Sequence, residues 1–136
     1  MRRAVLLCLL APVLASGGCT TANTASSGDF SGAEGDVAKV VSDLRSAGQR
    51  KDGDKICSQL LARSLVSRLD SSGTACRQEM TKAARDADEF ALDVRDVTVT
   101  GDQATAQVRQ GSDGPTGTFR FVRESGRWKI SELAGS

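Results

Sequence analysis

The sequence of 136 residues contains no histidine and no tyrosine, and only 4% of its residues are aromatic. Without imidazole or phenol side chains, a Ser-His catalytic triad, a histidine-ligated metal and a tyrosine acid are all excluded. Charge of one sign is not in excess either, because 18 Lys and Arg side chains stand against 17 Asp and Glu side chains. A near-neutral surface gives no electrostatic reason to bind nucleic acid. We therefore predict no metal site, no cofactor and no nucleic-acid partner.

One hydrophobic run stands out, and it lies at the N-terminus. Residues 4–15 form an apolar stretch of 12 residues that directly follows Arg2 and Arg3. A helix that spans a bilayer needs about 20 apolar residues, so this run is too short to be a permanent membrane span. Positively charged residues at the N-terminus followed by such an apolar run are typical of a secretory signal peptide, which we place at residues 1–18. Its removal leaves 118 of the 136 residues, enough for a single domain.

The segment Ser16-Gly17-Gly18-Cys19 resembles the lipobox of bacterial lipoproteins, although Ser16 stands where leucine is usual. The resemblance implies that Cys19 becomes the first residue, carries a lipid and anchors the chain at the extracytoplasmic face of the cell membrane. The alternative is ordinary signal cleavage, for instance after Gly17 or Ala22, which would give a secreted protein with Cys19 as an odd thiol.

Two of the four cysteines remain for the folded domain. Cys8 leaves with the signal peptide and Cys19 takes the lipid, so Cys57 and Cys76 are left. Cysteines of an exported chain usually pair, because the compartment is oxidising. A disulfide that closes a loop of this length contributes roughly 3 kcal/mol in the chain-entropy treatment. A redox or zinc site is disfavoured, since the chain has no C-x-x-C spacing and too few ligands.

The mature chain divides into a tether and one domain. Residues 19–33 are rich in Ser, Thr, Ala and Gly and read as a flexible tether that spans on the order of 20 Å. The domain occupies residues 34–134. A capping-box spacing at Ser31 and Glu34 predicts a helix start, and apolar residues then recur at helical spacing from Val37 until Gly48, which predicts the stop.

The period of the apolar residues changes near Phe90. Before it, short amphipathic segments carry the two cysteines; the second segment is capped by Thr74 and has Met80, Ala83 and Ala87 on its inner side. After it, alternation predicts strands with a bulge near residues 95–96, hairpin turns at residues 101–102 and 125–126, and a loop at residues 110–117. Helices followed by an antiparallel meander give an α+β fold.

This order of elements, with the ending Gly126-Arg127-Trp128-Lys129-Ile130, resembles the nuclear transport factor 2-like (SnoaL-like) superfamily. The two-cysteine helical segment also resembles small actinobacterial lipoproteins that carry such domains. The resemblance implies N-terminal helices packed on a curved antiparallel sheet, the cystatin-like cone. Members usually have more sheet than the four strands predicted here.

The superfamily includes isomerases and dehydratases as well as non-catalytic binding domains. Isomerase chemistry needs an Asp or Glu base in an apolar pocket and oxyanion donors, usually including a tyrosine, which this chain lacks. Asp93 and Asp96 are the remaining candidates, but their odd spacing on one strand places them on opposite faces unless the bulge re-aims one of them. We therefore predict a non-catalytic protein, with an isomerase-like or dehydratase-like enzyme as the alternative.

The partners predicted for this domain are the membrane, through the N-terminal lipid, and either an envelope protein or a small hydrophobic ligand. Four basic residues, Arg120, Arg123, Arg127 and Lys129, lie on the last hairpin. They are either a solvated surface that opposes aggregation or a site for an acidic partner or anionic lipid head groups. A homodimer that packs sheet on sheet is also left open.

Overall fold

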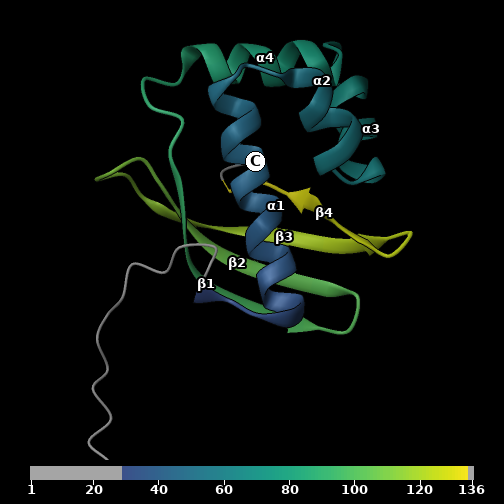
Figure 1. The fold of residues 1–136 in the computed structure, drawn as a ribbon. Coiled ribbons are helices and arrows are strands. Elements are labelled where there is room, and N and C mark those ends of the chain that lie inside the picture. Colours follow the sequence, from purple (N-terminus) through teal and green to yellow (C-terminus); the bar gives the residue numbers. More distant parts are fainter. Residues whose placement is uncertain (1–28, 135–136) are drawn as a thin grey trace, which may run out of the picture.

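The structure, a computed structural model, describes residues 29–134 (Figure 1). The predicted signal peptide, the predicted lipidation site Cys19 and most of the predicted tether lie outside these residues. Within the described part of the chain, no helix combines the length and the apolar character that crossing a bilayer requires.

Helices precede strands along the chain, which confirms the predicted α+β fold. The elements are α1 (Gly32–Gln49), α2 (Gly53–Lys55), the π-helical turn η2 (Ile56–Leu60), α3 (Arg63–Ser71), α4 (Cys76–Asp86), β1 (Leu92–Thr100), β2 (Gln103–Gln110), β3 (Thr116–Glu124) and β4 (Arg127–Glu132). The strands form one curved antiparallel sheet in the order β1-β2-β3-β4, and the helices pack against one face of it (Figure 1).

Alternation along the strands separates an apolar inner face from a polar outer face. In β2, Ala104, Ala106 and Val108 are buried, whereas the residues between them are not. The predicted bulge is confirmed, because the register of β1 against β2 shifts between Val94 and Asp96. The bulge lets both halves of β1 present valines to the core despite their opposite parity in the sequence.

Helix α1 lies across the inner face of the sheet (Figure 1). Val37, Val41 and Leu44 recur at helical spacing and are buried there. The predicted helix and its predicted start are confirmed, but the predicted stop at Gly48 is wrong, because the helix continues to Gln49. Ser31 occupies the N-cap position without a capping hydrogen bond from its side chain, and Gly48 lies inside the helix. The left-handed residue that follows the helix is Lys51, with φ of 57°.

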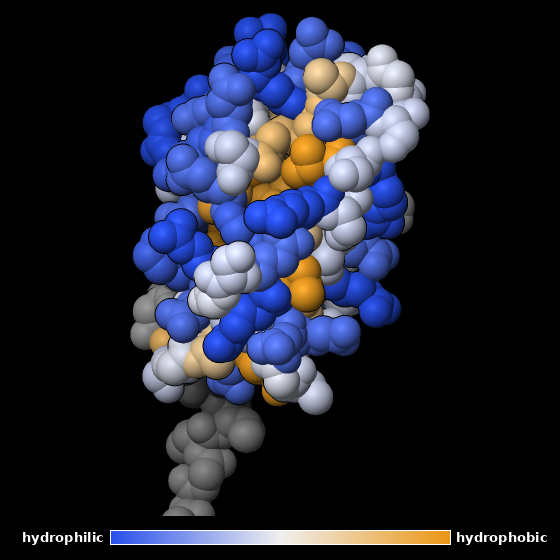
Figure 2. Space-filling view, turned by 90° about the vertical axis from the view of Figure 1, so that its right-hand side faces the viewer, coloured by the Kyte–Doolittle hydropathy of each residue, from blue (hydrophilic) through white to orange (hydrophobic). Residues whose placement is uncertain are grey.

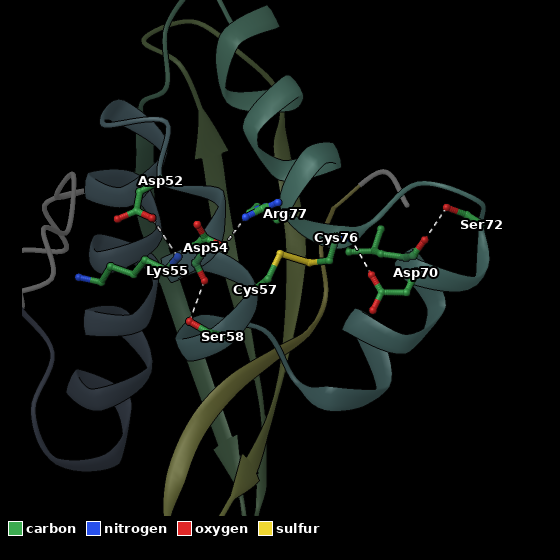
Figure 3. Close-up of a disulfide and its surroundings, with 10 residues drawn as sticks. Asp52, Asp54, Lys55, Cys57, Ser58, Asp70, Ser72, Cys76 and Arg77 are labelled. Carbon is green, nitrogen blue, oxygen red and sulfur yellow. Dashed lines mark hydrogen bonds and ion pairs between the residues drawn. A yellow bond between two sulfur atoms is a disulfide. The ribbon is translucent and has the colours of Figure 1, made fainter.

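A disulfide between Cys57 and Cys76 ties η2 to the start of α4, with the two Cα atoms 6.2 Å apart (Figure 3). The structure therefore has the predicted pairing. Neighbouring polar contacts support the same junction: the Asp70 carboxylate accepts a hydrogen bond of 2.7 Å from the Cys76 backbone N–H. This contact replaces the cap predicted for Thr74, because α4 begins one residue later, after Ala75.

The last hairpin turns at Ser125 and Gly126, which both have positive φ, as a two-residue turn of this hand requires. Beyond the turn, Trp128 and Ile130 are buried, and the guanidinium of Arg123 lies 4.6 Å from the centre of the Trp128 ring. On its outer edge, β4 receives a hydrogen bond from the Ala62 N–H to the Ile130 carbonyl, so this edge of the sheet is covered.

Candidate functional site: an apolar cavity between α4 and the sheet

A mainly apolar cavity has a volume of about 250 Å³ and opens where α1, α4 and the sheet meet. Its floor consists of buried side chains from α1, η2 and β3, and its walls come from α4, from the segment that enters β1 and from the chain after β4. The lining residues are Leu44, Ile56, Met80, Ala83, Ala87, Glu89, Phe90, Ala91, Leu92, Gln110, Phe119, Leu133 and Ala134.

Two walls of this cavity depend on glycines that allow close approach. A Cβ atom on Gly48 of α1 would lie 2.1 Å from the Phe90 ring, and a Cβ atom on Gly117 of β3 would lie 2.2 Å from the Ala134 side chain. No real Cβ contact is that short, so any larger residue would displace Phe90 or Ala134. Gly48 is therefore where Phe90, in the segment before β1, packs on α1, and Gly117 is where Ala134, in the segment after β4, packs on β3.

The disulfide positions the wall that α4 contributes. Ile56, on the cavity floor, directly precedes Cys57, and Met80, in the wall, lies about one helical turn after Cys76. A second link joins α4 to the neighbouring helix α2, because the Arg77 guanidinium lies 3.7 Å from the Asp54 carboxylate (Figure 3). Because that ion pair is exposed, the covalent bond is the stronger of the two links to α4.

Polar side chains touch the cavity only at its rim. Glu89 and Gln110 are its two polar lining residues, and both are exposed. A lining of this kind holds an apolar group by burial and offers at most one or two hydrogen bonds at the mouth. No group of three or more metal-ligating side chains occurs among residues 29–134.

The cavity volume limits what can enter. A protein cavity of about 150 Å³ with a purely apolar lining accommodates benzene, and drug-sized ligands occupy pockets of about 300–1,000 Å³. At about 250 Å³, this cavity has room for one substituted ring, a short alkyl chain or a single side chain of another protein.

The structure places Asp93 and Asp96 away from the cavity. The bulge does re-aim them: Asp93 pairs with Arg109 and Asp96 with Gln107, so both lie on the outer face. The Asp93 carboxylate lies 3.2 Å from the Arg109 guanidinium and 3.8 Å from that of Arg45 on α1. The bulge therefore places the two carboxylates on one face, which is the exception that the sequence left open, but their shared face is the polar one.

Part of this site follows from the sequence. The predicted inner side of the last helix, Met80, Ala83 and Ala87, does line the cavity. The sequence did not identify three other lining residues. Phe90 served only to mark where the spacing of apolar residues changes from helical to alternating, and Leu133 and Ala134 lie after the last strand. The signal that could have found them is the pair of glycines at Gly48 and Gly117, since a glycine inside a regular element often marks a close approach.

The described fold and its cavity can be compared with known proteins. The family model for the low molecular weight antigen MTB12, C-terminal domain, matches residues 65–134, from the first turn of α3 through the whole sheet. This match covers just over half of the 136 residues and agrees with a small protein of actinobacterial type. Comparison with curated proteins and with solved structures finds no match. The chain therefore belongs to the family of the MTB12 antigen C-terminal domain.

Proposed function

We propose that this protein is a non-catalytic lipoprotein of the cell envelope, anchored at the extracytoplasmic face of the membrane through Cys19. Its domain is a variant of the nuclear transport factor 2-like cone with a four-stranded sheet. It binds a small hydrophobic ligand, or one hydrophobic side chain of an envelope protein, in the cavity between α4 and the sheet. The observation that carries this proposal is the apolar cavity, whose polar side chains lie only at the rim.

The family match supports the envelope part of this proposal, because an antigen domain is compatible with an exported, non-catalytic protein. The disulfide supports export as well, since disulfides persist mainly in oxidising compartments. The curved antiparallel sheet with helices packed on one face supports the cone, because this is the arrangement that the resemblance implies.

The alternative, an isomerase-like or dehydratase-like enzyme, would need a carboxylate base in the apolar cavity. Asp93 and Asp96 give it no support, because they lie on the outer face of the sheet. Among the described residues, Glu89 is the one carboxylate that lines the cavity, and its exposure leaves it in contact with water. An apolar cavity with this rim is better suited to holding a group than to transforming it.

Substitution of Ala83 tests the cavity. We expect toluene to shift the methyl signals of Met80, Leu44 and Leu92 in the NMR spectrum of the protein, and an Ala83→Trp variant to abolish these shifts by filling the cavity. Gln78→Trp is the matched control, because Gln78 is an exposed residue of the same helix that does not line the cavity. The proposal fails if toluene leaves the wild-type methyl signals unchanged, or if the Ala83→Trp variant still responds.

Metabolic labelling with an alkynyl fatty acid tests the anchor. We expect the wild-type protein to carry the label and to fractionate with membranes, and a Cys19→Ala variant to lose both properties. A Cys19→Ala protein that is still labelled and still membrane-bound would contradict the proposed anchor. This experiment is independent of the cavity, so the two parts of the proposal can fail separately.

Association into homodimers is a separate proposal, because the superfamily often pairs sheet on sheet. The outer face that would pair is polar here and carries the Arg120–Glu132 ion pair, at 3.3 Å. A polar face of this kind favours a weak, salt-sensitive dimer over a permanent one. Light scattering at low and high salt gives the number of copies, and a single copy at both would refute the dimer.

A further inference from the structure

A second concave region lies on the side of the molecule formed by α3 and the β3–β4 turn. It has a volume of about 630 Å³ and is lined by Cys57, Ser58, Leu61, Arg63, Val66, Ser67, Glu124, Ser125, Arg127 and Lys129. Figure 2 faces this side and shows apolar surface in a hollow bordered by hydrophilic residues. We call this region the α3 groove. It shares no lining residue with the apolar cavity described above.

The charge of the α3 groove is unbalanced. Arg63, Arg127 and Lys129 line it, against the single carboxylate of Glu124. Glu124 is already engaged, because its Oε1 accepts a hydrogen bond of 3.2 Å from the Arg63 backbone N–H at the start of α3. Lys129 donates to the backbone carbonyl of Gln59. Within residues 29–134, the guanidinium groups of Arg63 and Arg127 have no carboxylate partner, and both side chains are exposed.

The arginine on the outer face of the sheet provides a contrast. Arg120 lines a different concave region of about 410 Å³, and there its guanidinium pairs with Glu132. Arg63 and Arg127 both line the α3 groove, one from the first residue of α3 and one from the first residue of β4. Two guanidiniums that line one groove and have no carboxylate partner among residues 29–134 are an arrangement that carboxylates fit, since a guanidinium can form two parallel hydrogen bonds to a carboxylate.

Between these charges, the α3 groove offers apolar contact. Leu61 is buried, Val66 is half-buried, and the half-buried Cys57 adds its disulfide sulfur. Inorganic anions would gain nothing from this surface, whereas a chain with both carboxylates and apolar side chains would contact all of it. The concave shape also favours an inserted peptide over a flat bilayer surface, because lipid head groups in a plane cannot reach both walls and the floor together.

We propose that the α3 groove binds an acidic peptide segment of a partner protein. Its carboxylates pair with Arg63 and Arg127, and an apolar side chain between them rests on Leu61 and Val66. This site is distinct from the apolar cavity, so the lipoprotein has one face for a small hydrophobic group and another for an acidic partner.

Fluorescence anisotropy of a labelled synthetic peptide, with alternating Glu, Asp and Leu residues, tests this proposal on the full-length protein in a neutral detergent. We expect saturable binding that weakens with added salt, and no binding of a matched peptide with Gln and Asn in place of the acids. An Arg63→Gln, Arg127→Gln double variant should bind roughly threefold to thirtyfold more weakly, because each exposed pair contributes modestly. The fluorescence of buried Trp128 reports whether each variant is folded.

The control variant is Arg50→Gln, Arg85→Gln, which removes the same charge from two exposed arginines outside the groove. It should bind the acidic peptide like the wild type. A reversed variant, Arg63→Glu, Arg127→Glu, should instead prefer a peptide in which Lys replaces the acids. The proposal is overturned if the control loses as much affinity as the groove variant, if the neutral peptide binds equally well, or if the acidic peptide does not bind. Stronger binding to phosphatidylglycerol vesicles, lost in the groove variant alone, would overturn it in favour of a lipid surface.

Discussion

The sheet and the helices α3 and α4 are stabilised in different ways. Every strand contributes large buried side chains to the core, among them Val97, Val108, Phe119, Phe121, Trp128 and Ile130. In contrast, α3 has one buried residue, Leu65, and the buried residues of α4 are Cys76 and Ala84. The sheet is therefore stabilised mainly by its own apolar burial. In contrast, α3 packs through Leu65 and the half-buried Val66 and Leu69, and α4 buries little and is also held by the disulfide.

This difference explains where the cavity lies. Its floor includes the well-packed inner face of the sheet, represented by Phe119, and one of its walls is α4, which buries little. A space remains between them because the side chains that line it there are small, Ala83 on α4 and Ala87 directly after it. The site thus lies at the boundary between the strongly packed region and the region that the disulfide holds in place.

The largest effect is expected in the sheet. Phe121 is among the largest fully buried side chains, and truncating a buried phenylalanine typically costs about 3–5 kcal/mol through lost burial and the cavity that remains. We expect Phe121→Ala to lower the free energy of unfolding by this amount, measured by urea denaturation without reductant. Thr98→Ala, on the exposed outer face, is the control and should change stability little. Equal losses in the two variants would contradict the assignment of inner and outer faces.

Removing the disulfide should have the next largest effect. In a Cys57→Ser, Cys76→Ser variant we expect a loss of about 2–5 kcal/mol, the usual result for a small exported domain. The loss should be concentrated in α4, because the strands do not depend on the bond. Hydrogen exchange should therefore accelerate more for amides of α4 than for those of β2 and β3. Uniform acceleration would show that the helices and the sheet unfold as one unit, and would contradict the proposed difference in how α4 and the sheet are stabilised.

The sequence predicted the features that depend on period and composition. Alternation identified the inner face of each strand, and the opposite parity of Val94 and Val97 identified the bulge, because only an extra residue lets both face one core. The pairing of Cys57 and Cys76 followed from the compartment and the cysteine count. The inner faces and the bulge rest on the order of apolar residues within one strand, and the pairing rests on the number of cysteines, so none of them requires knowledge of which distant segments touch.

Features that depend on contacts between distant segments were missed. Gly48 was interpreted as a helix stop, yet it is there to admit the Phe90 ring from 42 residues later in the chain. The cap of α4 was assigned to Thr74, whereas the carboxylate of Asp70 reaches the first N–H from the end of α3. The positive charge that Arg63 and Arg127 bring to one groove, with no carboxylate partner in the part of the chain that the structure describes, is likewise a property of two segments that meet only in the fold.

Gly48→Ala tests the close approach that builds one cavity wall. The new methyl group would lie 2.1 Å from the Phe90 ring, and overpacking of this kind costs about 1–3 kcal/mol, offset in part by the better helix propensity of alanine. We therefore expect a net loss of about 1 kcal/mol in urea denaturation. In a Phe90→Ala background the clash is absent, so the same substitution should stabilise the protein. A loss of equal size in both backgrounds would mean that Phe90 does not dock on Gly48.

The smallest effect is expected on the exposed side of α4. Hydrogen bonding and charge from Asp86 raise the pKa of Lys82 above its ordinary value. A raised pKa means that the pair stabilises the folded state below the ordinary pKa of lysine, and that this contribution disappears as the pH rises through the raised value. Because Lys82 is exposed, solvent and salt screen the pair. We expect Lys82→Met to be indistinguishable from the wild type in urea denaturation at pH 7, with or without added salt. A loss comparable to that of the disulfide variant would mean that surface charge holds α4 in place as strongly as the bond between Cys57 and Cys76 does.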